Sequence, residues 1–282
     1  MINLLFAGNR GVFDGVLSAM LSIVKRTGTT EPFRVILFTM DLSHLSPAYV
    51  PVTKEDTAFL ASVLREYNEK STVERVDVSA LYREEFAGCP NEGAYCSPYT
   101  LIRLLADRVQ SIPDKLLYLD IDVMLNRDIR LLYDVDVSAV EYAAARDHYG
   151  KYLIYPNYIN AGVLLLNMKK IRETGLFCRA RELLRKKKLT FADQSAIIRS
   201  TTKKKMLPQK FNDQKFLHRH TVVRHFSKRL FWLPYPHTEN IKQWHVARVR
   251  EVFRYTAFDD VFEEYLARKQ KYEKEKEGNH VK

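Results

Sequence analysis

The sequence predicts an α/β protein built on a mainly parallel sheet, and three observations support that fold class. Short apolar runs alternate with helical patterns up to about Asp147, as in parallel sheets whose strands are connected by helices. The runs are continuously apolar, which is typical of strands covered on both faces. The chain has 282 residues, of which 46% are hydrophobic, enough for one large domain with a sizeable core.

Each expected element rests on a local pattern. The expected strands are 2–7, 34–40, 73–79 and 115–120, and the expected helices are 16–26, 53–67 and 99–109. Val16, Met20 and Ile23 share one face of the first helix. Thr53 and Asp56 resemble an N-terminal capping box in which Asp replaces Glu.

The second half of the chain is less regular. Residues 162–177 predict a strand that passes into a helix. Near the C-terminus a helical face is expected from five apolar residues, namely Phe258, Val261, Phe262, Tyr265 and Leu266. From Arg268 the chain is almost purely polar, which predicts a frayed helix or disorder. We therefore expect one main domain over 1–250, followed by an amphipathic helix and a polar, basic tail over 251–282.

Composition narrows the classes of function. The net charge of +11 and the pI of about 9.4 favour anionic partners: nucleic acid, a phosphate-bearing ligand or an acidic membrane surface. The basic runs at 185–188 and 203–205 are short and lack interleaved aromatic residues, so a nucleic-acid-binding protein is the weaker, non-enzymatic alternative.

The cysteines and the N-terminus predict the compartment. The chain has an odd number of cysteines, namely Cys89, Cys96 and Cys178, which argues against a set of paired disulfides. Their spacing is not that of a zinc site, so we expect free thiols in a reducing environment. The first residues have neither the charged region nor the long apolar run of a signal peptide, and no stretch approaches the roughly 20 apolar residues of a membrane span. We expect a soluble cytoplasmic protein.

Two carboxylates end the apolar run "KLLYLDID", at Asp120 and Asp122. Side chains two apart in an extended chain point the same way, and α/β sheets bind ligands at the carboxyl ends of their strands. Converging carboxylates repel unless a cation lies between them, and Mn²⁺ or Mg²⁺ suits oxygen ligands.

A second Asp-x-Asp, at Asp134 and Asp136, follows a short helix or turn and is expected on the surface. Metal-dependent phosphoryl or nucleotidyl transfer is an alternative use of paired acids.

Three blocks identify a family. They are "LLYLDIDVMLNRDIRLLYDVDV", "YINAGVLLLNMKKIRETG" and "FADQSAI". In these blocks the chain closely resembles the retaining glycosyltransferases of family 8, which include glycogenin and bacterial lipopolysaccharide galactosyl- and glucosyltransferases. The resemblance implies a nucleotide-sugar-binding fold of the GT-A type and a Mn²⁺ ion. It also implies transfer of a hexose, glucose or galactose, from a UDP-sugar with retention, to a saccharide or lipid-linked acceptor. An acceptor of that kind would suit peripheral contact with an anionic membrane.

The resemblance also assigns the metal site and the diphosphate contacts. Asp120 and Asp122 would bind the metal, with Ile121 between them beside the nucleotide. The third ligand would be His225, which follows an apolar strand, while His237 is a rival in an apparent loop at 234–240. Lys242, in Lys-Gln-Trp where the family has Lys-Pro-Trp, would neutralise the pyrophosphate, with Lys228 as a substitute.

Further residues are assigned to the sugar and the nucleotide. The sugar site would comprise Asn160, Ala161, Gly162, Asp193 and Gln194, with Gln194 near the anomeric carbon and Arg103 paired with a carboxylate such as Asp193. The nucleotide site would comprise Ala7, Gly8, Asn9 and Phe13, and Asp147 would approach the acceptor. Because a neutral amide is a poor nucleophile, we favour front-face attack, with Asp193 as the fallback nucleophile.

Overall fold

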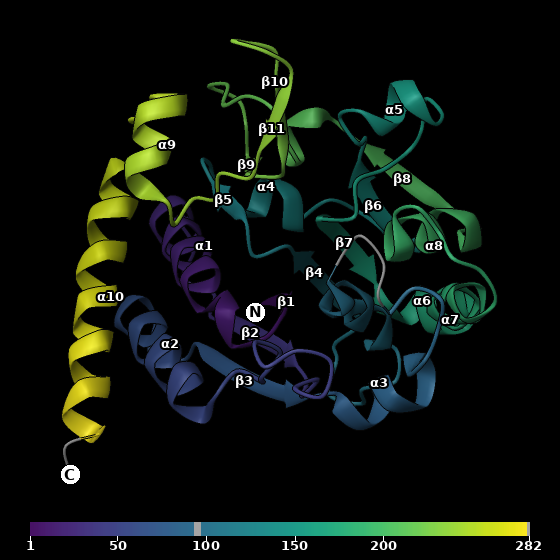
Figure 1. The fold of residues 1–282 in the computed structure, drawn as a ribbon, viewed down its shortest axis with the longest axis horizontal. Helices are drawn as coiled ribbons and strands as arrows, with labels where there is room; N and C mark the ends of the chain where they lie inside the picture. Colours follow the sequence, from purple (N-terminus) through teal and green to yellow (C-terminus); the bar gives the residue numbers. More distant parts are fainter. Residues whose placement is uncertain (93–96, 281–282) are drawn as a thin grey trace.

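A seven-stranded sheet runs through the centre of the protein, whose computed structural model describes residues 1–92 and 97–280 (Figure 1). Cys96 lies outside these residues. The strand order is β3-β2-β1-β4-β7-β6-β8. The strands are β1 (Ile2–Ala7), β2 (Phe33–Thr39), β3 (Thr72–Asp77), β4 (Lys115–Leu119), β6 (Tyr142–Ala145), β7 (Val163–Asn167) and β8 (Lys204–Leu207).

Strand β7 makes the sheet mixed. It runs antiparallel to β4 and β6, while the other paired neighbours are parallel. Two short antiparallel pairs stand outside the sheet: β5 (Val123–Leu125) with β9 (Val223–His225), and β10 (Arg229–Phe231) with β11 (His237–Glu239). The predicted α/β class with a mainly parallel sheet is confirmed.

Alternation along each buried strand divides the core into two clusters. Leu117 and Leu119 of β4 join one cluster, while Leu116 and Tyr118 join the other. The first cluster includes residues of α1 (Phe13–Arg26), α2 (Lys54–Tyr67), α9 (Val246–Phe253) and α10 (Asp259–His280). The second includes residues of α3 (Ser79–Phe86), η2 (Pro98–Leu105), α6 (Met168–Thr174), α7 (Leu176–Lys186) and α8 (Ala192–Ser200). Both faces of the sheet are therefore covered, as continuous apolar strands require.

Several local predictions are confirmed and others are wrong. The capping box of Thr53 and Asp56 is present at the start of α2. The helix expected over 99–109 is instead the 3₁₀ helix η2, which ends at Leu105. The loop expected at 234–240 is wrong in part, because residues 237–239 form β11.

The C-terminal segment also departs from expectation. The boundary expected after residue 250 falls inside α9, and the tail expected to fray or be disordered continues as α10 to His280. Leu266 is 46% exposed rather than part of the buried face. Among the residues described, no helix combines the length and apolar character needed to span a bilayer.

Tyr272 explains why this polar tail stays helical. Its ring stacks on Phe13 of α1, with 4.2 Å between centroids, and lies 4.7 Å from the ring of Phe59 of α2. Its hydroxyl donates to the buried Asp56, which also accepts from Lys276 Nζ at 3.0 Å. One aromatic anchor and one buried carboxylate therefore hold the end of α10 against the first two helices (Figure 1).

Replacing Tyr272 by alanine should destabilise the fold, because it removes a buried ring and a partner of Asp56. We expect a loss of about 3 kcal/mol in the free energy of unfolding, the scale for truncating a buried aromatic residue. Urea denaturation measures it. Tyr152→Ala, at a side chain 77% exposed, should change the same quantity by less than about 0.5 kcal/mol. Equal midpoints for the two variants would contradict this role of Tyr272.

Candidate functional site

The antiparallel course of β7 brings two predicted motifs together. Leu119, the last residue of β4, pairs with Val163, the first of β7. Asp120 N then donates to Gly162 O at 2.7 Å. The chain thus leaves β4 toward Asp120 at the same point where it enters β7 from Asn160, Ala161 and Gly162.

A second strand pair brings His225 to the carboxylates. Val123 of β5 pairs with His225 of β9, and Phe226 N donates to Asp122 O at 2.7 Å. One ligand atom each from Asp120, Asp122 and His225 lies within 4.8 Å of the others. His237 lies elsewhere, on β11, where its ring nitrogens contact Tyr235 O and Glu239. The structure therefore brings the predicted trio together and leaves the rival histidine out of it.

Each carboxylate in this trio has one oxygen engaged by the protein and one facing the other ligands. Asp120 Oδ1 accepts from Tyr118 OH at 2.7 Å and from Arg103 Nη2 at 3.0 Å. Asp122 Oδ2 accepts from Lys242 Nζ. The remaining oxygens, Asp120 Oδ2 and Asp122 Oδ1, lie 3.8 Å and 3.1 Å from His225 Nε2.

The trio fits a divalent cation. Two carboxylate oxygens and an imidazole nitrogen form a donor set that can hold a divalent cation. Burial alone would raise the pKa of Asp122, but the Lys242 ammonium outweighs it and holds that pKa well below its usual range. Asp122 is therefore an ionised ligand at neutral pH.

Gly162 leaves the space in which the ligands converge. A Cβ at this position would lie 2.4 Å from His225 Cε1 and 2.6 Å from Asp120 Oδ2. Real Cβ contacts are not that short, so any side chain would displace the imidazole or the carboxylate. Gly162, which was assigned to the sugar site, therefore also keeps open the space beside His225 and Asp120.

Arg103 connects the trio to α8. Its guanidinium is 4% exposed and donates to Ala161 O at 2.6 Å. Its Nε lies 3.3 Å from Asp193 Oδ2, so the predicted pairing with Asp193 is present. Burial raises the pKa of Asp193, Arg103 opposes that shift, and Asp120 adds to it.

The other predicted sugar-site residues converge on the same place. Gln194 Oε1 accepts from Ala161 N at 2.9 Å. Asn160 Nδ2 donates to Asp147 Oδ2 at 3.0 Å, while its Oδ1 accepts from Gly162 N at 3.0 Å. Asp147, Asn160 and Gln194 are thus joined through the segment that leads into β7.

Lys242 reaches the site although it lies seventeen positions after His225 in the chain. The intervening chain folds out as the β10–β11 hairpin and returns. Lys242 Nζ also donates to Phe226 O at 3.0 Å. Gln243 Nε2 donates to Ile121 O at 2.7 Å, so the departure from Lys-Pro-Trp supplies a donor to the peptide between the two carboxylates. Lys228 is exposed.

The nucleotide-end residues lie at the neighbouring strand end, with several groups engaged. Leu5 of β1 pairs with Tyr118 of β4, so the chain leaves β1 at Ala7 level with Asp120. Gly8 N donates to Phe38 O at 3.0 Å. The Asn9 side chain accepts from Gly11 N and donates to Ala48 O.

Phe13 was expected at the nucleotide, but its ring packs against Phe59 and stacks on Tyr272. A nucleotide contact by Ala7, Gly8, Asn9 or Phe13 stays a prediction.

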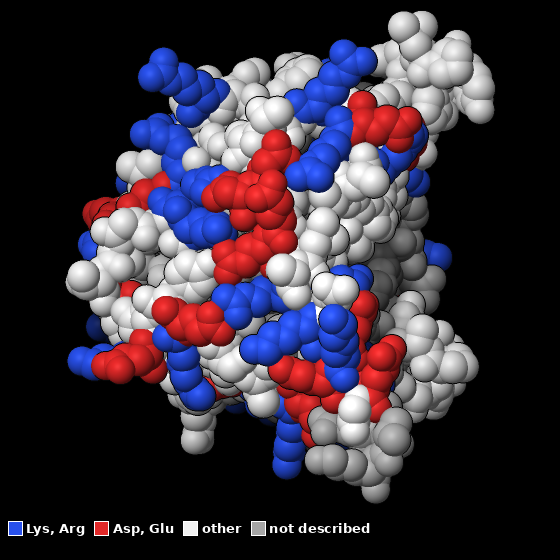
Figure 2. All heavy atoms as spheres, turned by 90° about the vertical axis from the view of Figure 1, so that its left-hand side faces the viewer, with Lys and Arg blue, Asp and Glu red and all other residues white. Residues whose placement is uncertain are grey.

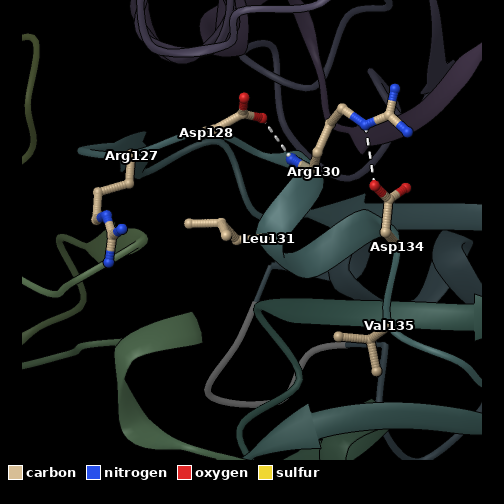
Figure 3. Close-up of a pocket in the computed structure, with 6 residues that line it drawn as sticks. All are labelled: Arg127, Asp128, Arg130, Leu131, Asp134 and Val135. Atoms are coloured by element: carbon tan, nitrogen blue, oxygen red, sulfur yellow. Dashed lines mark hydrogen bonds and ion pairs between the residues drawn. The ribbon is translucent and has the colours of Figure 1, made fainter.

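The second Asp-x-Asp lies on the surface, as predicted. Asp134 Oδ2 accepts from Arg130 Nε at 2.9 Å, beside a shallow hollow at α4 (Arg130–Tyr133), and Figure 3 shows this ion pair at the rim. Asp136 Oδ1 accepts from Ser138 N at 2.8 Å. Neither acid belongs to the trio.

Sequence reasoning missed two supporting residues. Tyr118 holds Asp120 Oδ1. Buried Asn212 contacts His225 Nδ1 through its Oδ1 at 3.0 Å, and its Nδ2 donates to Asn160 Oδ1 at 2.9 Å. An Nδ1–H donated to Asn212 leaves the Nε2 lone pair directed at the carboxylates. Asn212 carries no local signal of this role, because its partners lie 52 and 13 residues away.

Replacing Gly162 by alanine should weaken divalent-cation binding by roughly 10- to 100-fold, the range seen when groups around metal ligands are disturbed. The new methyl group would push against His225 and Asp120. Calorimetric titration with Mn²⁺ measures the affinity. Gly28→Ala is the matched control, since a Cβ there meets nothing within 4 Å. Unchanged Mn²⁺ affinity in Gly162→Ala would rule out this cation site.

Asn212→Ala should weaken Mn²⁺ binding over the same range of roughly 10- to 100-fold, because the imidazole loses the partner that fixes its tautomer and orientation. The same titration measures the effect. Asn157→Ala, at an exposed asparagine, should bind Mn²⁺ like the unmodified protein. Wild-type affinity in Asn212→Ala would show that Asn212 does not orient His225.

Comparison with solved structures finds the same fold. The galactosyltransferase LgtC, solved with donor and acceptor sugar analogues, superimposes with a TM-score of 0.67 at 23% identity, over 94% of this chain and 95% of that one. Mouse xyloside xylosyltransferase 1 gives a TM-score of 0.55 at 16% identity, over 79% of this chain and 96% of that one. The GT-A fold expected from the sequence is confirmed.

Comparison of sequences identifies the family. A Haemophilus influenzae protein that carries the name "Putative glycosyltransferase" is 23% identical over 186 residues. That alignment covers 62% of this chain and 51% of the relative, so the chain spans about half the relative's length. Residues 3–222 match the family described as glycosyl transferase family 8. The match extends over most of the chain, which therefore belongs to glycosyl transferase family 8.

Proposed function

We propose that this glycosyltransferase moves a hexose from a UDP-sugar to a saccharide or lipid-linked acceptor, with retention at the anomeric carbon. The cation would be Mn²⁺, with Mg²⁺ as an alternative. One observation carries the proposal. In Asp120 and Asp122 a protein donor engages one carboxylate oxygen, and the other oxygen faces His225 Nε2. A site arranged in this way is suited to a cation that binds a diphosphate.

The bound cation would supply positive charge to the departing diphosphate. Lys242 would add a second positive charge, because its ammonium lies at Asp122 and is only partly exposed. Preorganised charges of this kind usually contribute most to such transfers. Asp120, Asp122 and His225 would orient the donor so that its sugar lies toward Asn160 and α8.

The sugar site would use residues already linked to one another. Asp193 would bind donor hydroxyls, since Arg103 fixes its position. Gln194 would lie near the anomeric carbon, and Asn160 would contact hydroxyls of donor or acceptor. Asp147, hydrogen-bonded to Asn160, would border the acceptor.

Front-face attack accounts for retention with the fewest demands on these residues. The acceptor oxygen would bond to the anomeric carbon as the bond to the UDP oxygen breaks, and the acceptor proton would pass to the departing phosphate. Gln194 is neutral and its Oε1 is engaged by Ala161 N, so it is a poor nucleophile. Asp193 is the fallback nucleophile, although its ion pair with Arg103 stabilises the carboxylate and lowers its nucleophilicity.

Asp120→Asn and Asp122→Asn should each lower the rate of UDP release from the preferred donor by about 100-fold or more, because each removes charge from the cation site. UDP release with UDP-glucose, UDP-galactose and UDP-N-acetylglucosamine, in the presence of Mn²⁺, measures it. The chain offers a matched control in its second Asp-x-Asp, since Asp134→Asn and Asp136→Asn alter surface acids and should retain full activity.

Two results would contradict the proposed function. One is wild-type activity in Asp120→Asn and Asp122→Asn. The other is turnover of a nucleoside triphosphate with no UDP released from any UDP-sugar, which would instead indicate phosphoryl or nucleotidyl transfer.

A further inference from the structure

Highly exposed apolar side chains are concentrated in two segments. Among the described residues, five large apolar side chains are more than 60% exposed, and all five lie at 152–153 or 232–235. They are Tyr152 (77%), Leu153 (80%), Trp232 (68%), Leu233 (83%) and Tyr235 (67%). Single exposed apolar residues are ordinary, whereas a cluster of them marks an interaction site.

Contacts join the two segments into one surface. Leu230 N of β10 donates to Tyr149 OH at 3.4 Å, next to α5 (Gly150–Leu153). The guanidinium of Arg229 lies over the ring of Phe216, 5.4 Å from its centroid. We call the surface formed by 149–155, Phe216 and 229–235 the docking surface. The hairpin and α5 stand at the same end of the molecule in Figure 1.

The segments of the docking surface are more basic than acidic. None of the 34 Asp and Glu residues of the chain falls within 149–155 or 214–238. The second range contains five Lys and Arg, of which Arg224 is buried. Lys151 adds a cation beside Tyr152, 4.9 Å from its ring centroid. The hairpin's one acid, Glu239, lies opposite Arg229 and is ion-paired with Arg248. Exposed apolar groups therefore occur here together with an excess of positive charge.

The side of the molecule formed by α9 and α10 is different. Figure 2 shows Lys and Arg interspersed with Asp and Glu on that side, while the projection at its top carries neither colour. Cations of the tail have acidic partners, as in Arg268 with Glu66, Lys269 with Asp14 and Lys276 with Asp56. The excess positive charge of the C-terminal tail is thus largely balanced, and α10 is the weaker candidate for an anionic partner.

We propose that the docking surface binds an anionic lipid bilayer, with Trp232, Leu233, Tyr235, Tyr152 and Leu153 inserted at the level of the headgroups. Trp and Tyr favour the membrane interface, aliphatic side chains gain from burial in the acyl region, and nearby cations are attracted to anionic headgroups. A second copy of the chain fits less well, since pairing two such surfaces would bring like charges together.

The docking surface borders the candidate site. The hairpin leaves the chain after His225 and returns before Lys242, and both residues contact Asp122. Segment 149–155 begins two residues after Asp147, which is hydrogen-bonded to Asn160. Binding there would present lipid-linked acceptors beside the site, a consequence that rests on the proposed function. The lipid contact itself does not require catalysis.

Sedimentation with vesicles tests the proposal. The full chain should sediment with phosphatidylcholine vesicles that contain phosphatidylglycerol and much less with phosphatidylcholine alone, and added salt should weaken binding. Leu233→Glu should lower the partition coefficient by about tenfold or more, since it removes an apolar insertion and adds a repelled charge. Leu45→Glu, at a leucine 45% exposed outside the docking surface, should bind like wild type.

Fluorescence and turnover give independent readouts. Brominated phospholipid should quench Trp232, and Trp232→Phe should abolish most of that quenching although Trp244 remains. UDP release with water as the acceptor should be unchanged in Leu233→Glu, so failure of the transferase assay would not affect the vesicle result. The proposal fails if the wild-type protein does not sediment with anionic vesicles or if Leu233→Glu binds these vesicles as tightly as the wild type. It also fails if Leu233→Glu only raises KM for a soluble saccharide acceptor, because the surface would then bind the acceptor sugar rather than lipid.

Discussion

The candidate site depends on one buried positive charge, the guanidinium of Arg103, which lies between the carboxylates of Asp120 and Asp193. Without it the buried Asp193 would lose its cationic partner, and removing one partner of a buried pair typically costs about 3–5 kcal/mol. The same guanidinium binds Ala161 O. A single side chain of η2 therefore fixes the end of β4, the entry to β7 and the start of α8. The attraction of both acids to Arg103 overcomes their mutual repulsion and fixes their positions.

The reversed direction of β7 is the topological counterpart of this arrangement. If β7 ran parallel to β4, the residues that precede β7 would lie beside the start of β4 and not beside its end. Because β7 is antiparallel, Gly162 lies against Asp120, and its missing side chain leaves room for His225. The β5–β9 pair then supplies the imidazole, and Asn212 orients it. Backbone pairing thus does most of the positioning, and side-chain hydrogen bonds set which atoms face the cation site.

The segment from His225 to Lys242 combines two structural features. Its ends deliver a histidine and a lysine to Asp122, while its middle projects apolar residues into solvent. Exposed Trp, Leu and Tyr side chains that cluster at one place favour a partner that covers them. At another side of the molecule, α10 covers apolar residues of α1 and α2 through Tyr272.

The sequence by itself determined the α/β class and the strands that carry the motifs, because these follow from local periodicity. It also predicted that Asp120 and Asp122 converge, but not for the reason given by side-chain alternation, since β4 ends at Leu119 and Asp122 lies in the turn that follows. The three family blocks added the GT-A fold and the candidates His225, Arg103 and Asp193. Only the tertiary structure decided that His225 rather than His237 joins the acids, that Asn212 and Tyr118 support them, and that the polar tail is helical. Those outcomes depend on residues distant in the chain: Asn212 meets Asn160 across 52 residues, and Tyr272 meets Asp56 across 216. Local sequence patterns carry no information about contacts formed only when the chain closes on itself.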